Sequence, residues 1–207
     1  MTTVLLTGFE PFDGQQVNAS WAAVREVERG WSAPSTLVTA LLPVSFARAP
    51  GRLRALIAEH RPDLVVCVGE AGGRGRVSIE RVGINVQDAR IPDEDGAQPV
   101  DVPVVDGGPA AHFSTLPVKA AMLAVQAAGV PGEVSNTAGT FVCNTIAYAV
   151  GEQQVRGGFV HVPRLPEQMP PGEPSMSAQD AGRALGAILH AALTTADDLA
   201  VTAGTEH

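Results

Sequence analysis

Apolar residues along this chain recur in two alternating patterns. Short runs rich in β-branched residues alternate with longer stretches whose apolar positions repeat at helical spacing. The short runs predict strands at residues 4–7, 36–42, 63–69 and 158–163, and the longer stretches predict helices at residues 21–30, 50–60, 117–128, 142–150 and 178–193. This βαβα order is typical of an α/β fold. The run at residues 63–69 is almost entirely apolar, which favours a central parallel strand covered on both faces.

The pattern changes between residues 76 and 115. An extended stretch at residues 76–87 leads into a segment rich in proline, aspartate and glycine. This composition predicts a hairpin or a long functional loop. The sequence leaves open whether the loop at residues 91–108 closes over a substrate.

Composition narrows the classes of function. The chain has 207 residues, 45% of them hydrophobic, which predicts a single domain over residues 1–207 with a fraying tail at residues 194–207. Its net charge of −8 argues against nucleic acid or an anionic membrane as a partner. There is no basic leader and no apolar run long enough to span a membrane, so we expect a soluble, cytoplasmic protein.

The two cysteines do not form a recognisable framework. Cys67 and Cys143 are too few for a disulfide scaffold, and no histidine or cysteine stands at metal-ligand spacing. We therefore expect reduced thiols, no metal and no cofactor. Cys67 lies within an apolar strand pattern, which favours an inert, buried thiol.

Cys143 is the candidate nucleophile. It lies where a loop of small residues gives way to the helical repeat that begins at Val142, so we expect it in the first turn of a helix. Free N–H groups and the helix dipole favour an anion there and would lower the pKa of the thiol. His161, in an extended segment further along, is a suitable base. The structural alternatives are a small core hydrophobe for Cys143 and a hydrogen-bonded core histidine for His161.

Glu80 falls on an apolar strand face. Strand parity places its side chain with Val82 and Ile84 rather than among polar neighbours. A carboxylate there needs a partner, and a histidine is suitable because the carboxylate fixes its tautomer. The other ring nitrogen is then free to take a proton from a thiol. The alternative is an ordinary solvated strand residue.

Ordered motifs extend this picture over most of the chain. They read Leu6-Thr-Gly-Phe9-Glu-Pro-Phe12, Gly72-Gly-Arg74, Ile79-Glu80-Arg81, Asp88-Ala-Arg90-Ile-Pro-Asp93, Phe113-Ser-Thr-Leu-Pro117, Ser135-Asn-Thr-Ala-Gly-Thr-Phe-Val-Cys143-Asn144 and Gly158-Phe-Val-His161-Val-Pro163. Together they resemble the pyroglutamyl peptidase I family, also called pyrrolidone-carboxylate peptidases. The resemblance implies a single-domain, three-layer α/β/α sandwich with a mostly parallel, twisted central sheet. It also implies a cytosolic cysteine exopeptidase that removes N-terminal pyroglutamate (5-oxoproline) from peptides, assembled as a homo-oligomer, either a dimer or a tetramer.

The same resemblance assigns the site. It implies a catalytic triad of Glu80, Cys143 and His161, with Arg90 near the site to support an oxyanion. It also implies a slot for the lactam ring, formed by Phe9, Phe12, Ile91 and Val142, with Asn18 and the backbone around Glu70 for polar contacts. A lactam carries no charged amine, so such a slot needs only one acceptor and one donor.

Three positions depart from the pattern that we associate with the family. Asp13 stands where glycine is commoner, Glu70 where many members have glutamine, and Thr145 where histidine or tyrosine often follows. Glu70 matters most, because its charge would raise the thiol pKa unless the side chain is turned outward.

Two rival functions use other features. The glycine-rich residues 69–75 follow a strand, as phosphate-binding loops do, which raises a nucleoside- or phosphate-binding protein as one alternative. These residues lack the G-x-G-x-x-G order and the Gly-Lys-Ser/Thr ending, and an extended segment follows them instead of a helix. The second alternative is a non-catalytic module that binds 5-oxoproline without hydrolysing an amide.

Overall fold

A six-stranded sheet forms the middle layer of the computed structural model, which describes residues 2–204. The strands lie in the order β2-β1-β3-β8-β4-β7, and β4 and β8 run antiparallel in this otherwise parallel sheet. Their bounds are β1 Thr3–Phe9, β2 Thr36–Leu42, β3 Leu64–Ala71, β4 Val77–Glu80, β7 Gly132–Ser135 and β8 Gly157–Pro163. A separate antiparallel ribbon pairs β5 Val82–Ile84 with β6 Ala111–Phe113.

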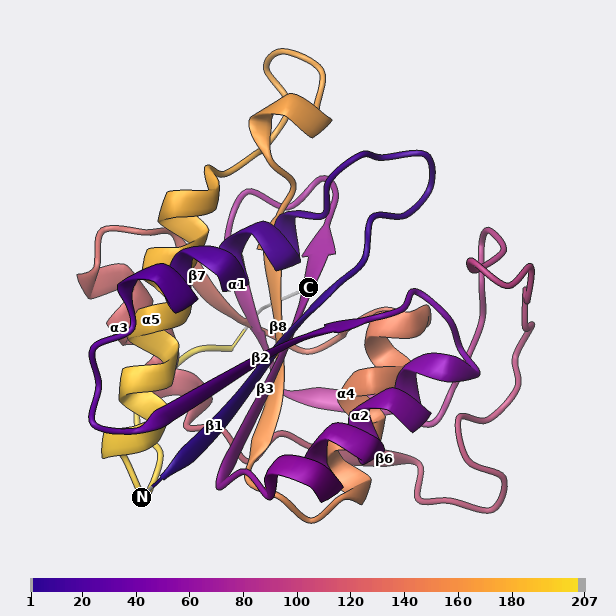
Figure 1. Cartoon of the computed structure of the whole chain (residues 1–207), viewed down its shortest axis with the longest axis horizontal. Helices are drawn as coiled ribbons and strands as arrows, with labels where there is room; N and C mark the ends of the chain where they lie inside the picture. The colour runs from indigo at the N-terminus through magenta and orange to yellow at the C-terminus, as the bar shows by residue number, and fades with distance from the viewer. Residues whose placement is uncertain (1, 205–207) are drawn as a thin grey trace.

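Helices cover both faces of the sheet (Figure 1). Their bounds are α1 Ala19–Gly30, α2 Arg48–His60, α3 Val118–Ala127, α4 Val142–Glu152 and α5 Ala178–Thr194, with a short 3-10 helix, η1, at Pro166–Gln168. One core cluster packs α1, α3 and α5 against the sheet, and a second packs α2 and α4 against its other face. The predicted α/β/α sandwich with a mostly parallel sheet is therefore confirmed.

Individual elements agree with the sequence pattern to different degrees. The predicted central strand is β3, which lies between β1 and β8 and is buried from Leu64 to Val68. The start of α1 differs from the predicted start at residue 21, because the helix begins at Ala19 and Asn18 caps it. Likewise, α2 begins at Arg48 rather than at Pro50.

The extended stretch at residues 76–87 forms two strands rather than one. It divides into β4, which pairs antiparallel with β8 in the main sheet, and β5, which pairs antiparallel with β6 across the long loop. The edge strand β7 was not predicted, because its four residues contain no apolar run. Within the described part of the chain, no helix has both the length and the apolar character needed to cross a membrane.

The first part of the loop at residues 91–108 is fastened to the start of α2. The Asp93 carboxylate accepts a hydrogen bond of 2.8 Å from the Phe46 backbone, and Asp95 forms a two-point pair with Arg48, each contact 2.8 Å long. The hydrogen bond from Arg48, assisted by that of Ser45, lowers the pKa of Asp95 to about 2. Figure 1 shows the rest of the loop extending away from the sheet on the side of α2.

The predicted fraying tail, residues 194–207, falls partly outside the described residues, since 205–207 are not described. Within the described part, the Asp198 carboxylate accepts hydrogen bonds from the backbone of Lys119 and Ala120, in the first turn of α3. These contacts satisfy helix N–H groups that otherwise have no partner.

Candidate active site

Cys143 is the second residue of α4, so its predicted place in a first helical turn is confirmed. The N-cap residue, Phe141, makes no side-chain capping bond, so no N-cap side chain takes up the first backbone N–H groups of the helix. Asn144 fixes this end of the helix: its amide accepts from Ile84 N at 2.9 Å and donates to the carbonyls of Ile84 and Val86 at 2.9 and 2.8 Å. Cys143 as a whole residue is partly exposed.

Sheet register brings Cys143 next to His161. Gly69 of β3 lies opposite His161 of β8, so both positions face the same side of the sheet. A Cβ added at Gly69 would lie only 2.7 Å from Cys143 Sγ, which means that the sulfur lies directly over this glycine. Phe159 faces the same side, with its ring centroid 4.9 Å from that of His161. The thiol and the imidazole therefore share one face of two adjacent strands.

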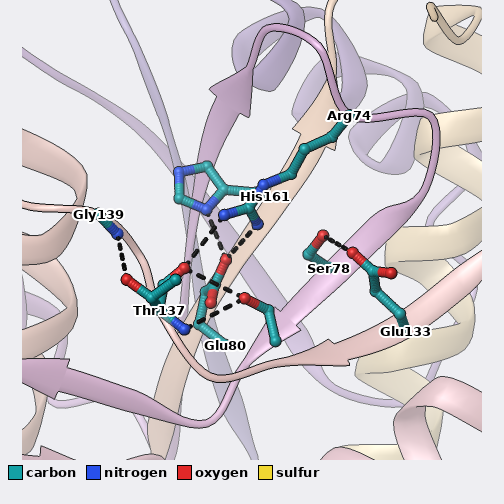
Figure 2. Close-up of polar contacts among 8 residues, drawn as sticks. Arg74, Ser78, Glu80, Glu133, Thr137, Gly139 and His161 are labelled. Atoms are coloured by element: carbon teal, nitrogen blue, oxygen red, sulfur yellow. Dashed lines mark hydrogen bonds and ion pairs between the residues drawn. The ribbon is translucent and has the colours of Figure 1, made fainter. Parts of the chain in front are cut away.

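Glu80 and Arg74 complete a buried polar cluster beside the imidazole (Figure 2). Glu80 Oε1 lies 2.7 Å from His161 Nδ1 and 2.7 Å from Arg74 Nη1, and the Glu80 side chain is 1% exposed. Arg74 also donates to the Thr137 carbonyl at 3.1 Å. Because an ionised carboxylate only accepts hydrogen bonds, Nδ1 must carry the proton and Nε2 is left free as a base.

The charge state of Glu80 follows from its partners. Burial by itself would raise the pKa of this carboxyl, but the hydrogen bond from His161, the charge of the imidazolium when that ring is protonated, Ser135 and Arg74 outweigh it and lower the pKa below its ordinary value. Glu80 is therefore ionised at neutral pH.

The thiol behaves differently from the sequence prediction. Burial, followed by the negative charges of Glu70 and Glu80, raises the pKa of Cys143 to about 12, against the opposing effects of Arg74 and of its own backbone N–H. The predicted lowering by the helix start is thus wrong, because desolvation and two carboxylates outweigh the helix end. The predicted effect of Glu70 is confirmed. A neutral thiol of this kind needs a base to become a nucleophile.

Cys67 has none of this environment. It lies in β3, fully buried, and burial raises the pKa of its thiol to about 12 as well. It belongs to the core cluster beneath α2 and α4. The Thr7 side chain acts to lower its pKa, but the effect of burial is larger. The two thiols therefore do not differ in pKa. They differ because Cys143 lines a cavity and shares a sheet face with a base, whereas Cys67 does not line that cavity.

A cavity of about 290 Å³ opens beside Cys143. All six residues implied for the lactam slot line it, namely Phe9, Phe12, Asn18, Glu70, Ile91 and Val142, and Arg90, implied as support for an oxyanion, lines it too. Further lining residues that were not predicted are Asp13, Val44, Asp88, Thr140, Phe141 and Arg164. Phe141 completes the aromatic wall, with its ring centroid 5.6 Å from that of Phe12 and 5.1 Å from that of Phe46.

Both ends of the Asn18 amide make contacts within the protein. Its Oδ1 accepts from the backbone and hydroxyl of Ser20 at 3.0 and 2.7 Å, and its Nδ2 donates to the Glu10 carbonyl at 2.9 Å. An amide nitrogen carries two hydrogens, so one N–H remains for a ligand.

Two arginines next to the site were not singled out from the sequence. Arg74, rather than Arg90, contacts the Glu80 carboxylate that holds His161, whereas Arg90 is exposed at the cavity wall. Arg164, directly after β8, lies 3.3 Å from the Glu70 carboxylate through its Nε. The sequence signal for both is weak: one lies in a glycine-rich turn before Glu80, and the other follows the strand that carries His161.

Neither a metal site nor a phosphate site at the glycine-rich residues 69–75 is supported by the described residues. Among residues 2–204, no group of three or more histidine, cysteine, aspartate or glutamate side chains is arranged to hold a metal ion. The glycine-rich segment leads into β4, not into a helix, so it lacks the helix N-terminus that cradles a phosphate.

Comparisons with known proteins agree with this geometry. A family model described as pyroglutamyl peptidase matches residues 2–195. The pyrrolidone-carboxylate peptidase of Streptomyces coelicolor is 51% identical over 216 residues, covering 100% of both chains, and that of Clavibacter michiganensis is 50% identical over 210 residues, covering 99% of both.

Solved structures give the same result. The crystal structure of pyroglutamyl peptidase I from Bacillus amyloliquefaciens matches with a TM-score of 0.92 and 40% identity, covering 96% of this chain and 100% of that one. The pyrrolidone carboxyl peptidase of Thermococcus litoralis matches with a TM-score of 0.91 and 31% identity, covering 98% and 100%. The resemblance drawn from the motifs is confirmed, and the chain belongs to the pyroglutamyl peptidase family of cysteine peptidases, which are hydrolases.

Proposed function

We propose that this chain releases N-terminal pyroglutamate from peptides through a thioester on Cys143. In this proposal His161 is the general base and Glu80 orients it. One observation carries the proposal: the 2.7 Å contact between Glu80 and His161 involves a histidine on the sheet face over which the Cys143 thiol lies, and Cys143 itself lines the cavity. Nucleophile, base and orienting carboxylate are the arrangement that activates a weak nucleophile.

Acylation begins from the neutral thiol. His161 Nε2 takes the Sγ proton as the sulfur attacks the carbonyl carbon that joins pyroglutamate to the next residue. The backbone N–H of Cys143, with Arg90 nearby, stabilises the negative oxygen of the tetrahedral intermediate. When the C–N bond breaks, His161 gives this proton to the leaving amine, and a thioester on Cys143 remains.

Deacylation repeats these steps with water. His161 takes a proton from the water as it attacks the thioester carbonyl, and the C–S bond breaks. The departing sulfur recovers the proton from His161, which restores the neutral thiol and releases free pyroglutamate. The ionised Glu80 stabilises the imidazolium that forms in each half of the reaction.

Selectivity follows from the character of the cavity. Phe9, Phe12, Ile91 and Val142 offer an apolar slot for the ring, and the free N–H of Asn18 suits the lactam carbonyl. The backbone around Glu70 suits the lactam N–H, since β1 pairs with β3 only as far as Cys67 while β3 continues to Ala71. An N-terminal proline would have to bury a charged amine in this slot, which is strongly unfavourable.

A fluorogenic assay tests this proposal. Release of 7-amino-4-methylcoumarin is measured from its pyroglutamyl and prolyl amides under reducing conditions, with wild type, Cys143→Ala and Cys67→Ala. We expect turnover of the pyroglutamyl amide alone, abolished in Cys143→Ala and kept in Cys67→Ala. Turnover that survives in Cys143→Ala would reject the assignment, and a folded wild type without turnover would reject the activity.

We also propose a cytoplasmic homo-oligomer. A reducing compartment suits the two free thiols, Cys67 and Cys143. Among the large apolar side chains that are exposed in the described part of the chain, the three most exposed along residues 91–113 are Val100 at 68%, Val102 at 41% and Phe113 at 69%, which supports association of chains through this segment. Light scattering after size-exclusion chromatography measures the assembly, and a monomer at micromolar concentration would contradict it.

A further inference from the structure

One carboxylate in the pocket wall has no step in the proposed reaction. Glu70, near the end of β3, has a side chain that is 13% exposed. Its Oε2 accepts hydrogen bonds from Ala19 N at 2.8 Å and from Gln168 Nε2 at 3.0 Å, and its Oε1 lies 3.3 Å from Arg164 Nε. Three separate segments thus meet on one side chain: the start of α1, the residue after β8, and the end of η1.

The start of α1 is continuous with the wall of the cavity. Asn18, the residue before Ala19, caps the helix and donates to the Glu10 carbonyl at 2.9 Å. The Ser20 hydroxyl accepts a hydrogen bond of 2.9 Å from Phe9 N. Because Asn18 and Phe9 both line the cavity, a group that holds Ala19 in place also holds these two residues.

Gln168 holds the other side of this connection. Its Oε1 accepts from Leu165 N at 2.9 Å, and its Nε2, besides bonding Glu70, lies 3.2 Å from the Val17 carbonyl. Gln168 is not among the residues that line the cavity. It can therefore influence a bound ligand only through the residues that it holds.

We propose that Glu70 is a positioning residue, whose carboxylate ties the pocket wall at residues 9–18 to the segment at residues 164–168 and so sets the width of the lactam slot. The inference rests on the proposed function, because the width of the slot matters only if a lactam binds there. Two donors already occupy Oε2 and a guanidinium faces Oε1, so the carboxylate acts on the substrate through the wall.

Electrostatics fits positioning better than catalysis. The charges of Glu80 and Arg74 act on the Cys143 thiol besides that of Glu70, and the charge of Glu70 works against forming a thiolate. A carboxylate that opposes ionisation of the nucleophile does not assist the chemical step. Its contacts instead join three segments of the chain.

The test uses steady-state kinetics on the pyroglutamyl coumarin amide with four variants. We expect Glu70→Ala to raise KM by about tenfold while kcat stays within about threefold of wild type. Glu70→Gln keeps an oxygen acceptor for Ala19 N and should restore most of the affinity. Gln168→Leu should raise KM by about threefold, and the control Glu167→Gln, an exposed carboxylate on the same 3-10 helix, should change nothing.

The double variant separates positioning from direct contact. If Glu70 acts through the wall, Gln168→Leu adds little to Glu70→Ala, because the bond between the two side chains is already lost. Full additivity, an unchanged KM in Glu70→Ala, or a loss confined to kcat would each overturn the proposal. Calorimetric titration of pyroglutamyl amide into Cys143→Ala and into Cys143→Ala/Glu70→Ala gives a readout without turnover, and we expect a similar tenfold loss of affinity.

The same data distinguish the two levels of inference. A wild type that neither binds nor hydrolyses a pyroglutamyl amide would overturn the function and this inference together. A wild type that does both, with Glu70→Ala indistinguishable from it, would overturn the positioning role alone.

Discussion

Gly69 is the position where one added methyl group should damage the site most directly. In Gly69→Ala, the new Cβ would lie 2.7 Å from Cys143 Sγ and 2.9 Å from Phe159 Cζ. Heavy atoms of this kind rest at about 3.5 Å or more, so the sulfur must move by about 1 Å. A misplacement of this size costs about 100-fold in rate, or about 2.7 kcal/mol in the barrier.

The assay is kcat/KM on the pyroglutamyl coumarin amide, together with thermal unfolding. Overpacking should lower the stability of Gly69→Ala by about 1–3 kcal/mol, so activity is measured well below its melting temperature. Gly75→Ala is the matched control, because its Cβ would meet Pro174 at an ordinary 3.5 Å. A folded Gly69→Ala with kcat/KM within twofold of wild type would refute the inferred position of the sulfur.

Three further predictions test the slot, the orienting carboxylate and the loop. Phe12→Ala removes part of the apolar wall and should raise KM about fivefold, from roughly 1 kcal/mol of lost burial, with kcat kept; an unchanged KM would remove Phe12 from the slot. Glu80→Gln should lower kcat by about 10³- to 10⁴-fold, because the tautomer of His161 is no longer fixed; a loss below tenfold would argue against orientation by Glu80. Asp95→Asn should lower the melting temperature at pH 7. Because pairing with Arg48 lowers the pKa of Asp95 to about 2, this stabilisation is complete above the ordinary carboxyl pKa and disappears as pH falls towards 2. The difference from wild type should therefore narrow between about pH 4 and pH 2, and a constant difference would contradict the assignment.

Strongly periodic segments and ordered motifs predicted most of the architecture. Local patterns predict the central strand and the position of Cys143 in a first helical turn. They also predict the end of α1 at Gly30 and the start of α5 at Ala178. The short strand β7 does not follow from local patterns, because it becomes a strand only by pairing with β4. Likewise, Asn18 and Ser20 are both good N-cap residues, so the local sequence does not show which of them caps α1. In the structure Asn18 caps the helix, and the Ser20 hydroxyl accepts a hydrogen bond from Phe9 N.

Properties that depend on distant residues could not be predicted in this way. The pKa of Cys143 is set by burial and by carboxylates from β3 and β4, which overcome the local helix end that the sequence shows. The hydrogen bond between Arg74 and Glu80 forms because the turn after β3, which carries Arg74, lies close to Glu80 at the end of β4. In both cases the deciding contacts join segments that only the sheet order brings together.

Trapping the acyl-enzyme tests the central claim most directly. Wild type is mixed with an activated ester of pyroglutamate, whose good leaving group makes deacylation the slow step, then quenched in acid and mapped by mass spectrometry. The account predicts one pyroglutamyl group on the peptide that carries Cys143, none on the peptide that carries Cys67, and none with the matching prolyl ester. Turnover of the ester with no acyl group on Cys143, or with the group on another residue, would contradict it.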